Sequence, residues 1–413
     1  MSAPRVVGPV GATAVVAGSM LGVGILLTPP VVASSVPSLP GFFAMWLAGA
    51  VVAACGGMVY AELGAMLPEA GGDVVFLRRA FGRGVAVLVG AVIFVGAFAG
   101  SIAAMSVALC TYQTQTLLGA ALGSSAPDLS ATWVAGVRGD QLLGAAVIVG
   151  LTAVNGLGAR ASTAVQTALT VVPVVGLAAL GLWGIANGQA QLAPPPGEVH
   201  DVGQAWLGVY FAYAGWPAIL YVAGEVRDPG RTLPVAVLGG TALIAVLYGL
   251  LCAAFVVVLG FEQLAASGEA GTALARSLLG EEAAVGVAAL VALALLASVN
   301  ATVLGGARLA WAMARQLDLA ALTPLDRHGT PARLLWVQGA LAVGLALSGT
   351  FEVLMAWTTL AMLVAGSLVV VAHGWLRRVE PELPRPFRAW AHPLPSLVYV
   401  GSCVAAIGLL AWG

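Results

Sequence analysis

Long apolar stretches, separated by short polar or turn-rich connections, run from one end of the chain to the other. A helix needs about 20 apolar residues to cross roughly 30 Å of hydrocarbon. The stretches that approach this length cover residues 8–33, 41–67, 85–118, 141–157, 162–186, 204–224, 233–260, 283–306, 334–350, 352–376 and 393–413. This pattern predicts an all-α polytopic membrane protein with about 11 transmembrane helices.

Two of these stretches are interrupted near their middle by residues that weaken a helix. The first interruption is residues 18–24 (GSMLGVG), and the second is residues 211–217 (FAYAGWP). Glycine lowers the cost of leaving the helix, and proline removes a backbone donor. Within a bilayer, non-helical backbone is tolerated only where protein buries it or water reaches it. A pair of interrupted segments therefore predicts a substrate site near the bilayer midplane.

Each interruption, taken alone, also has a simpler explanation. Gly18 and Gly22 form a GxxxG pair, which in membranes usually indicates close helix packing. Phe211, Tyr213 and Trp216 would be ordinary interior or interfacial aromatic residues. Helix packing does not require a second interruption at the corresponding place, so the two interruptions together favour a binding site.

The interruptions fall in the first stretch of each half of the chain. Residues 8–186 and 204–376 each hold five stretches, and residues 393–413 add a further helix. An odd number of crossings inverts the second unit relative to the first. We therefore expect residues 1–413 to form one transmembrane domain with a five-plus-five inverted repeat. Its broken helices 1 and 6 would run antiparallel with their gaps facing each other.

Composition supports the membrane assignment. Hydrophobic residues make up 60% of the chain and charged residues 8%, and the mean hydropathy is +0.99. A soluble domain contains about 25% charged residues. The chain therefore has too few charges to cover a soluble surface.

The seventeen positively charged side chains are all arginines, because the sequence contains no lysine. With the N-terminus in the cytoplasm, only Arg138 and Arg276 lie outside. The arginines then inside are Arg5, Arg78, Arg79, Arg83, Arg160, Arg227, Arg231, Arg308, Arg315, Arg327, Arg333, Arg377, Arg378, Arg385 and Arg388. This asymmetry predicts an integral plasma (inner) membrane protein with a cytoplasmic N-terminus, and the odd number of crossings places the C-terminus outside.

The cysteines and histidines indicate no catalytic or metal centre. Cys55, Cys110, Cys252 and Cys403 share no metal-ligand or redox spacing, and we interpret them as small apolar packing residues. The histidines are scattered over connections and segment ends. We expect no enzymatic activity, no metal and no cofactor. The lipid bilayer is an expected partner and nucleic acid is not, and the oligomeric state is left open.

The interruptions suit a zwitterionic ligand. A helix that stops within the bilayer leaves its first N–H groups unpaired and points the positive end of its dipole at the gap. An anion suits that end, and the exposed carbonyls of the opposing half-helix suit an ammonium group. A free amino acid carries both charges and is the expected small-molecule partner. The aromatic residues at the second interruption can form a pocket wall or a lid for its side chain.

Residues 18–25 resemble the first-helix signature of the amino acid-polyamine-organocation (APC) superfamily of permeases. Further landmarks follow in the family's order over nearly the whole chain. They are residues 60–64, 68–73, 80–82, 211–216, 224–229, 231–234, 307–315, 329–331 and 385–388. The resemblance implies the fold with two broken helices, and the transport of amino acids.

The resemblance also implies which residues bind the substrate. The backbone groups that would hold its carboxylate belong to Met20, Gly22, Val23, Gly24 and Ile25. The carbonyls that would receive its amino group lie near Gly18, Ser19, Phe211 and Ala214. Ala212 and Gly215 complete this set, and Ser101 would supply a side-chain contact. Phe211 and Trp216 are the expected gate.

Two departures from the family pattern bear on substrate and coupling. Pro173 stands where many relatives have a lysine on the fifth helix, so a lysine-based proton switch is excluded. Pro217 stands where relatives that exchange arginine or polyamines have an acidic residue. No carboxylate occupies the central part of any stretch, so substrates with neutral side chains are favoured.

The leading hypothesis is a secondary active transporter, a permease or exchanger for neutral L-amino acids that works by alternating access. An amino acid exporter or a proton-coupled symporter of the same fold is the alternative. Ser298 and Thr302 leave sodium coupling open, although hydroxyls four residues apart more often bond to their own helix. A membrane enzyme or a channel is a weaker alternative, since we find no acid-base constellation and no ring of charge.

Two carboxylates, Glu62 and Glu225, are the ones expected within reach of the membrane interior. Either could serve proton coupling. An unpaired charge at the bilayer centre costs at least about 2.5–3.5 kcal/mol. Pairing with loop arginines such as Arg227 or Arg79 is therefore the favoured interpretation.

Overall fold

The computed structural model describes residues 5–189, 201–349 and 351–412. Helices dominate this part of the chain. The first half contains α1 (Pro9–Met20), α2 (Gly24–Ser35), α3 (Leu39–Met66), α4 (Asp73–Phe81), α5 (Arg83–Val92), η1 (Ile93–Ala99), α6 (Gly100–Ala108), η2 (Leu109–Thr114), α7 (Gln115–Leu122), η3 (Gly123–Ser125), β1 (Thr132–Val134), β2 (Val137–Arg138), α8 (Gly139–Asn155) and α9 (Ala159–Asn187). The second half contains α10 (Val202–Tyr213), α11 (Ala218–Tyr221), η4 (Ala223–Glu225), α12 (Pro229–Ala266), α13 (Ala270–Leu279), α14 (Glu281–Gln316), α15 (Ala332–Ser348), α16 (Phe351–Val379) and α17 (Leu394–Trp412).

Every predicted apolar stretch corresponds to a helix or a run of helices. Within the described residues, 7 spans are long and apolar enough to cross a membrane, and α8, α15 and α17 are shorter apolar helices. The pair α10 and α11 accounts for the remaining stretch. The prediction of an all-α polytopic membrane protein is thus confirmed. The division into the repeats 8–186 and 204–376 stays a prediction.

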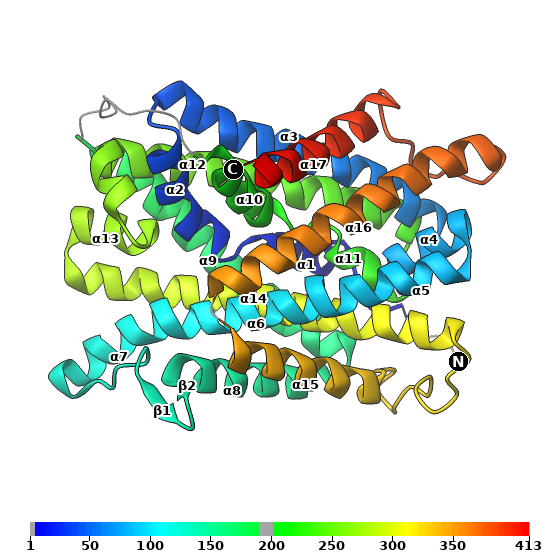
Figure 1. The fold of residues 1–413 in the computed structure, drawn as a ribbon, viewed down its shortest axis with the longest axis horizontal. Helices are drawn as coiled ribbons and strands as arrows, with labels where there is room; N and C mark the ends of the chain where they lie inside the picture. The colour runs from blue at the N-terminus through cyan, green and yellow to red at the C-terminus, as the bar shows by residue number, and fades with distance from the viewer. Residues whose placement is uncertain (1–4, 190–200, 350, 413) are drawn as a thin grey trace.

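Most of the long helices run along the long axis of the molecule (Figure 1). The helices α7 and α13 and the hairpin of β1 and β2 lie at one end, and α4 lies at the other (Figure 1). The half-helices α1 and α2 pack against α9, α10, α12 and α14. In the apolar windows of Pro9–Ser35 and Glu281–Gln316, 72% of residues are buried, against 33% in Ala159–Asn187. The interrupted first span therefore lies in the core.

Four elements in the connections were not predicted. Helix α4 follows Gly71 and Gly72, whose φ angles of 122° and 51° allow the tight turn before it. Helix α13 is capped by the Glu269 carboxylate, which accepts hydrogen bonds from the N–H groups of Gly271 and Thr272. The strands β1 and β2 form a short antiparallel hairpin. None of these elements is long enough to give a transmembrane pattern.

The third span, Arg83–Ser125, is one continuous path that contains two π-helical stretches, η1 and η2. Such stretches are frequent at functional sites because they rotate side chains away from the regular helical positions. Ile93, Ala97 and Phe98 of η1 line the central cavity described below. The irregular stretch thus forms part of the cavity wall.

Candidate functional site

The first helix is broken at three residues. Helix α1 ends at Met20 and α2 begins at Gly24, and Leu21 has the extended angles φ −73° and ψ 94°. The N-cap of α2, Val23, provides no side-chain hydrogen bond to the helix. The first N–H groups of α2 therefore lack a side-chain cap. The break is narrower than the predicted residues 18–24, because Gly18, Ser19 and Met20 continue α1.

The second break lies between Tyr213 and Ala218. Ala214 is extended, with ψ 162°. Gly215 has φ 107°, a value that residues other than glycine rarely adopt. Pro217 is the N-cap of α11 and makes no side-chain hydrogen bond to it. Phe211 and Ala212, which the sequence placed in the break, belong to α10.

The two broken helices touch at their breaks. A Cβ added to Gly215 would lie 2.6 Å from the Ser19 carbonyl oxygen, and one added to Gly24 would lie 2.4 Å from the Ala212 Cα. The Tyr248 hydroxyl of α12 lies 2.6 Å from the Met20 carbonyl oxygen and 3.1 Å from that of Ala212. Tyr248 therefore bridges carbonyls at the ends of both half-helices. The predicted juxtaposition of the two breaks is confirmed.

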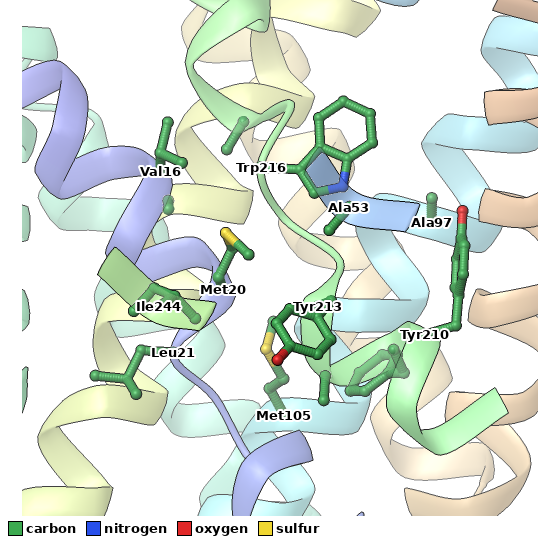
Figure 2. Close-up of a cluster of buried hydrophobic side chains, with 14 of the residues drawn as sticks. Val16, Met20, Leu21, Ala53, Ala97, Met105, Tyr210, Tyr213, Trp216 and Ile244 are labelled. Atoms are coloured by element: carbon green, nitrogen blue, oxygen red, sulfur yellow. The ribbon is translucent and has the colours of Figure 1, made fainter. Parts of the chain in front are cut away.

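A cavity of about 110 Å³ lies where the breaks meet. The predicted site residues that line it are Ser19, Met20, Gly22, Val23, Gly24, Ser101, Phe211, Ala212, Ala214, Gly215 and Trp216. Figure 2 shows both breaks as thin, non-helical trace, with Met20, Tyr213 and Trp216 around them. The fold thus gathers these residues around one hollow, and their contact with a substrate stays a prediction.

Two predicted residues do not line this cavity. A Cβ on Gly18 would lie 2.2 Å from Thr170 Oγ1 and 2.3 Å from Gln166 Nε2, so Gly18 permits close packing of α1 on α9. Ile25 is fully buried away from the cavity. For Gly18, the packing explanation of the GxxxG pair is therefore the better one, whereas Gly22 lies on the cavity wall.

Hydroxyl groups of α6 and α14 reach the cavity. Ser101 is buried, and its Oγ has no hydrogen-bond partner among the described residues. Ser298 Oγ donates a 3.0 Å hydrogen bond to the Ser19 carbonyl, and Thr302 Oγ1 bonds at 2.8 Å to the Ser298 carbonyl of its own helix. Ser101 therefore offers a free hydroxyl. The Thr302 hydroxyl bonds to its own helix, as expected for hydroxyls four residues apart.

Aromatic side chains close one side of the cavity. The Trp216 ring packs edge-on against Tyr60 and Tyr399, with ring centroids 4.7 and 6.2 Å apart. The hydroxyls of Tyr399 and Tyr210 are 2.6 Å apart. Trp216 thus belongs to a packed group on α3, α10 and α17, a position compatible with the predicted gate. Tyr60, although part of the landmark 60–64, and Tyr399 were not expected in this group, because they come from other helices.

Glu62 lies outside the cavity, in an ion-pair cluster. It is fully buried, and Arg377 binds it through two guanidinium nitrogens. The Ala389 N–H donates to it at 2.7 Å, and Arg385 Nε lies 3.2 Å from its Oε1. The prediction that an arginine pairs with Glu62 holds, but Arg79 is the wrong partner, because it pairs with Glu380.

Glu225 also lies outside the cavity. Its carboxylate accepts a 2.9 Å hydrogen bond from Arg308 Nε of α14, and both side chains are buried. The expected partner Arg227 instead donates to the Arg5 carbonyl. A coupling role for Glu62 or Glu225 stays a prediction, and neither carboxylate reaches the cavity.

Asp73 is the carboxylate that the sequence analysis missed. It lies at the first position of α4, is 4% exposed and lines the cavity. The Tyr221 hydroxyl donates a 2.9 Å hydrogen bond to its Oδ2. The two carboxylates considered for coupling, Glu62 and Glu225, therefore omit one that reaches the central cavity. The sequence signal was present, since Asp73 ends the family landmark 68–73.

Residues 7–413 match the family model described as "Amino acid permease". Among curated proteins, the chain is 26% identical to the serine/threonine exchanger SteT of Bacillus subtilis (strain 168) over 353 residues, which cover 83% of this chain and 75% of the relative. It is 25% identical over 398 residues to the b(0,+)-type amino acid transporter 1 of Mus musculus, with 94% and 79% covered. It is 25% identical over 429 residues to the large neutral amino acids transporter small subunit 2 of Homo sapiens, with 98% and 77% covered.

These matches span nearly the whole chain, as do the motifs that resemble the APC superfamily. The relatives are transporters and exchangers rather than enzymes. The chain belongs to the amino acid permease family.

Proposed function

We propose that this chain moves amino acids with uncharged side chains across the membrane by alternating access. The substrate zwitterion would bind at the two breaks, with its carboxylate at the N-terminus of α2 and its side chain in the central cavity. The half-helices α1, α2, α10 and α11 would rock with their partners against the other helices and expose the site to each side in turn.

The observation that carries this proposal is the cavity at the meeting point of the two breaks. A helix N-terminus contributes typically about 0.3–1 kcal/mol to the binding of a negative charge, and up to about 2 kcal/mol when partly buried. The uncapped N–H groups of α2 add direct hydrogen bonds. Together they can replace much of the hydration that a carboxylate loses.

The lining of the cavity supports an uncharged side chain. Apolar residues such as Ile93, Ala97, Met105 and Met362 form much of the wall. Among the described residues, no arginine or histidine lines it, so an acidic side chain would find no counter-ion there. The relatives named for serine, threonine and large neutral amino acids agree with this substrate class.

The proposal is tested by counterflow in proteoliposomes that contain the purified chain. Vesicles loaded with one unlabelled neutral amino acid should accumulate the same amino acid in labelled form. Gly22→Leu should abolish counterflow, because Gly22 lines the cavity and a leucine side chain would fill it. An alanine Cβ would meet Ser298 Oγ at an ordinary 3.5 Å, so Gly22→Ala should fold.

The matched control is Gly239→Leu in α12, where an added Cβ meets nothing within 4 Å. This variant should transport like the wild type. Unchanged counterflow in a folded Gly22→Leu protein would place the substrate elsewhere. The same assay, with substrate supplied on either side of oriented vesicles, distinguishes an exchanger from an exporter.

A further inference from the structure

Asp73 is a buried carboxylate on the cavity wall with one unpaired oxygen. The residue precedes the third span and lies outside the membrane-crossing helices. Its Oδ2 accepts the hydrogen bond from Tyr221, whereas its Oδ1 is buried and has no hydrogen-bond partner among the described residues. Leaving such an oxygen unpaired is costly. A hydrogen-bond donor, a bound cation or protonation of the carboxylate itself would each satisfy this oxygen.

The surroundings of Asp73 provide hydroxyl groups but no positive charge. The other ionisable side chains that line the cavity are all tyrosines, namely Tyr60 of α3, Tyr210 of α10, Tyr221 of α11 and Tyr399 of α17. No ion pair found within the described residues includes Asp73. The carboxylate is thus free to be neutralised by something that enters the cavity.

The cations on α4 and on the helices packed against it either contact other groups or are exposed to solvent. On α4, Arg78 pairs with Glu69, and Arg79 pairs with Glu380. On α5, Arg83 pairs with Asp318. On α14, Arg308 pairs with Glu225, and Arg315 lies over the Trp311 ring. On α16, His373 and Arg377 contact Glu62, and Arg378 is exposed. The acidic groups Glu281 and Glu282 lie in the first turn of α14.

We propose that Asp73 is the proton-binding site that couples amino acid transport to proton movement, an inference that rests on the proposed function. The proton would bind Oδ1 and convert the carboxylate into a neutral carboxyl group, while Oδ2 goes on accepting from Tyr221. The proton would leave from the same oxygen after the cavity has opened to the other side of the membrane. The chain contains no lysine that could serve instead.

Burial raises the pKa of Asp73 to about 7, although the Tyr221 hydroxyl, which donates a hydrogen bond to it, and the nearby Tyr60 hydroxyl act in the opposite direction. A group with a pKa near neutrality can both take up and release a proton under physiological conditions. The position of Asp73 in the cavity wall locates the proton site, and its pKa sets the pH range in which the site gains and loses a proton.

Electrostatic repulsion would link the proton to the substrate. A bound amino acid brings a second carboxylate into a cavity that already contains Asp73. Like charges repel strongly where water is largely excluded, so the substrate should bind better when Asp73 is protonated. By reciprocity, bound substrate favours protonation by the same factor. The cavity then holds no net charge while it is enclosed.

Tyr221 connects Asp73 to the part of the molecule expected to move. This residue ends α11, the short helix directly after the second break. Its hydroxyl donates to Asp73, and its carbonyl accepts a 2.9 Å hydrogen bond from the Gly71 N–H. The turn before α4 is thus tied to the second broken helix at two points. A change in the charge of Asp73 acts directly on that contact.

The test uses proteoliposomes of the full-length chain with a pH-sensitive dye inside. An inward gradient of one pH unit can drive about tenfold accumulation of a substrate that moves with one proton. The wild type should show this accumulation, with substrate-dependent acidification of the lumen. Asp73→Asn should lose both, and Asp73→Glu should restore both in part because it keeps a titratable carboxyl group.

The matched control is Glu69→Gln, which removes a carboxylate from the same connection but lies outside the cavity. It should behave like the wild type. If Asp73→Asn is too slow for flux measurements, binding of labelled amino acid to the solubilised protein replaces them. Affinity should fall as the pH rises through about 7 in the wild type, whose Asp73 pKa lies there, and should be independent of pH in Asp73→Asn.

Three outcomes would overturn the inference. One is Asp73→Asn with undiminished proton flux or an unchanged pH dependence of binding. Another is a wild type that shows counterflow without any proton movement, a result that leaves the proposed function intact. The third is a defect in Asp73→Asn confined to substrates with cationic side chains. Absence of counterflow in the wild type would instead overturn the proposed function itself.

Discussion

At the scale of single residues, the site depends on positions where the backbone is exposed or close to other backbone. Gly215 combines a φ of 107° with a contact to Ser19 that leaves no room for a Cβ. Tyr248 satisfies carbonyls that the breaks would otherwise leave unpaired. These two residues stabilise the non-helical backbone at the breaks and the contact between them. A substitution at each residue tests this role.

Gly215→Ala should lower the free energy of unfolding by about 1–3 kcal/mol, because a residue forced into such a strained conformation costs this much. The added Cβ would also lie 2.6 Å from the Ser19 carbonyl oxygen. Thermal unfolding in detergent, followed by tryptophan fluorescence, measures the effect. Gly239→Ala, with open space around its Cβ, is the control. Equal melting temperatures for the two variants would contradict the described break.

Tyr248→Phe should destabilise the protein by about 1–2 kcal/mol, since it removes a donor from two buried carbonyls. The control is Tyr213→Phe, which removes a hydroxyl for which no hydrogen bond is found within the described residues. Thermal unfolding of both variants gives the comparison. A larger loss in Tyr213→Phe than in Tyr248→Phe would argue against the bridging role.

Asp73 should make stability depend on pH. The unfolded chain releases this proton near pH 3.8, whereas the folded chain holds it to about pH 7. The free energy of unfolding should therefore fall by on the order of 4 kcal/mol as the pH rises from about 4 to 7, and stay level above that. Melting temperatures measured over this range should show the slope, and Asp73→Asn should flatten it. An identical slope in both proteins would assign the effect to another group.

At the scale of elements, a buried ion pair anchors the segment that follows the second break. Glu225 of η4 pairs with Arg308 of α14, and its backbone carbonyl accepts from the N–H groups of Val6 and Val7. Three segments that are distant in sequence therefore meet at one residue. The pair lies away from the cavity lining, so we expect its removal to lower the stability of the protein.

Glu225→Ala should destabilise the protein by about 3–5 kcal/mol, because it leaves the Arg308 charge buried without a partner. The double variant Glu225→Ala with Arg308→Met should recover most of this loss, since neither residue then carries a charge, and Arg308→Met alone completes the comparison. Melting temperatures of the single and double variants give the coupling. Additive losses would show that the two residues do not act as a pair.

At the scale of the whole molecule, the distribution of arginines predicts that the N-terminus faces the cytoplasm. A single cysteine at Ser124, in the exposed turn after α7, should react with a membrane-impermeant maleimide in intact cells. A cysteine at the exposed Glu382 should react only after permeabilisation. The native cysteines are buried, so the wild type supplies the background. The reverse labelling pattern would show that the N-terminus faces outward and contradict the predicted orientation.

The sequence by itself determined the membrane class, the helices and the approximate positions of both breaks. These properties follow from local features, namely runs of apolar residues and clusters of glycine and proline. The ends of the breaks were less certain, because Gly18, Phe211 and Ala212 can all continue a helix when packing favours it. Family motifs added the central residues of the cavity.

Only the tertiary structure decided the partners of the buried charges and the place of Asp73. Arg377 is 315 residues from Glu62, and no local pattern relates two positions so far apart. Asp73 lies in a polar connection between two predicted spans, where a carboxylate is usually solvated. The turn at Gly71 and Gly72 folds it back against Tyr221, and this long-range contact buries it in the cavity wall.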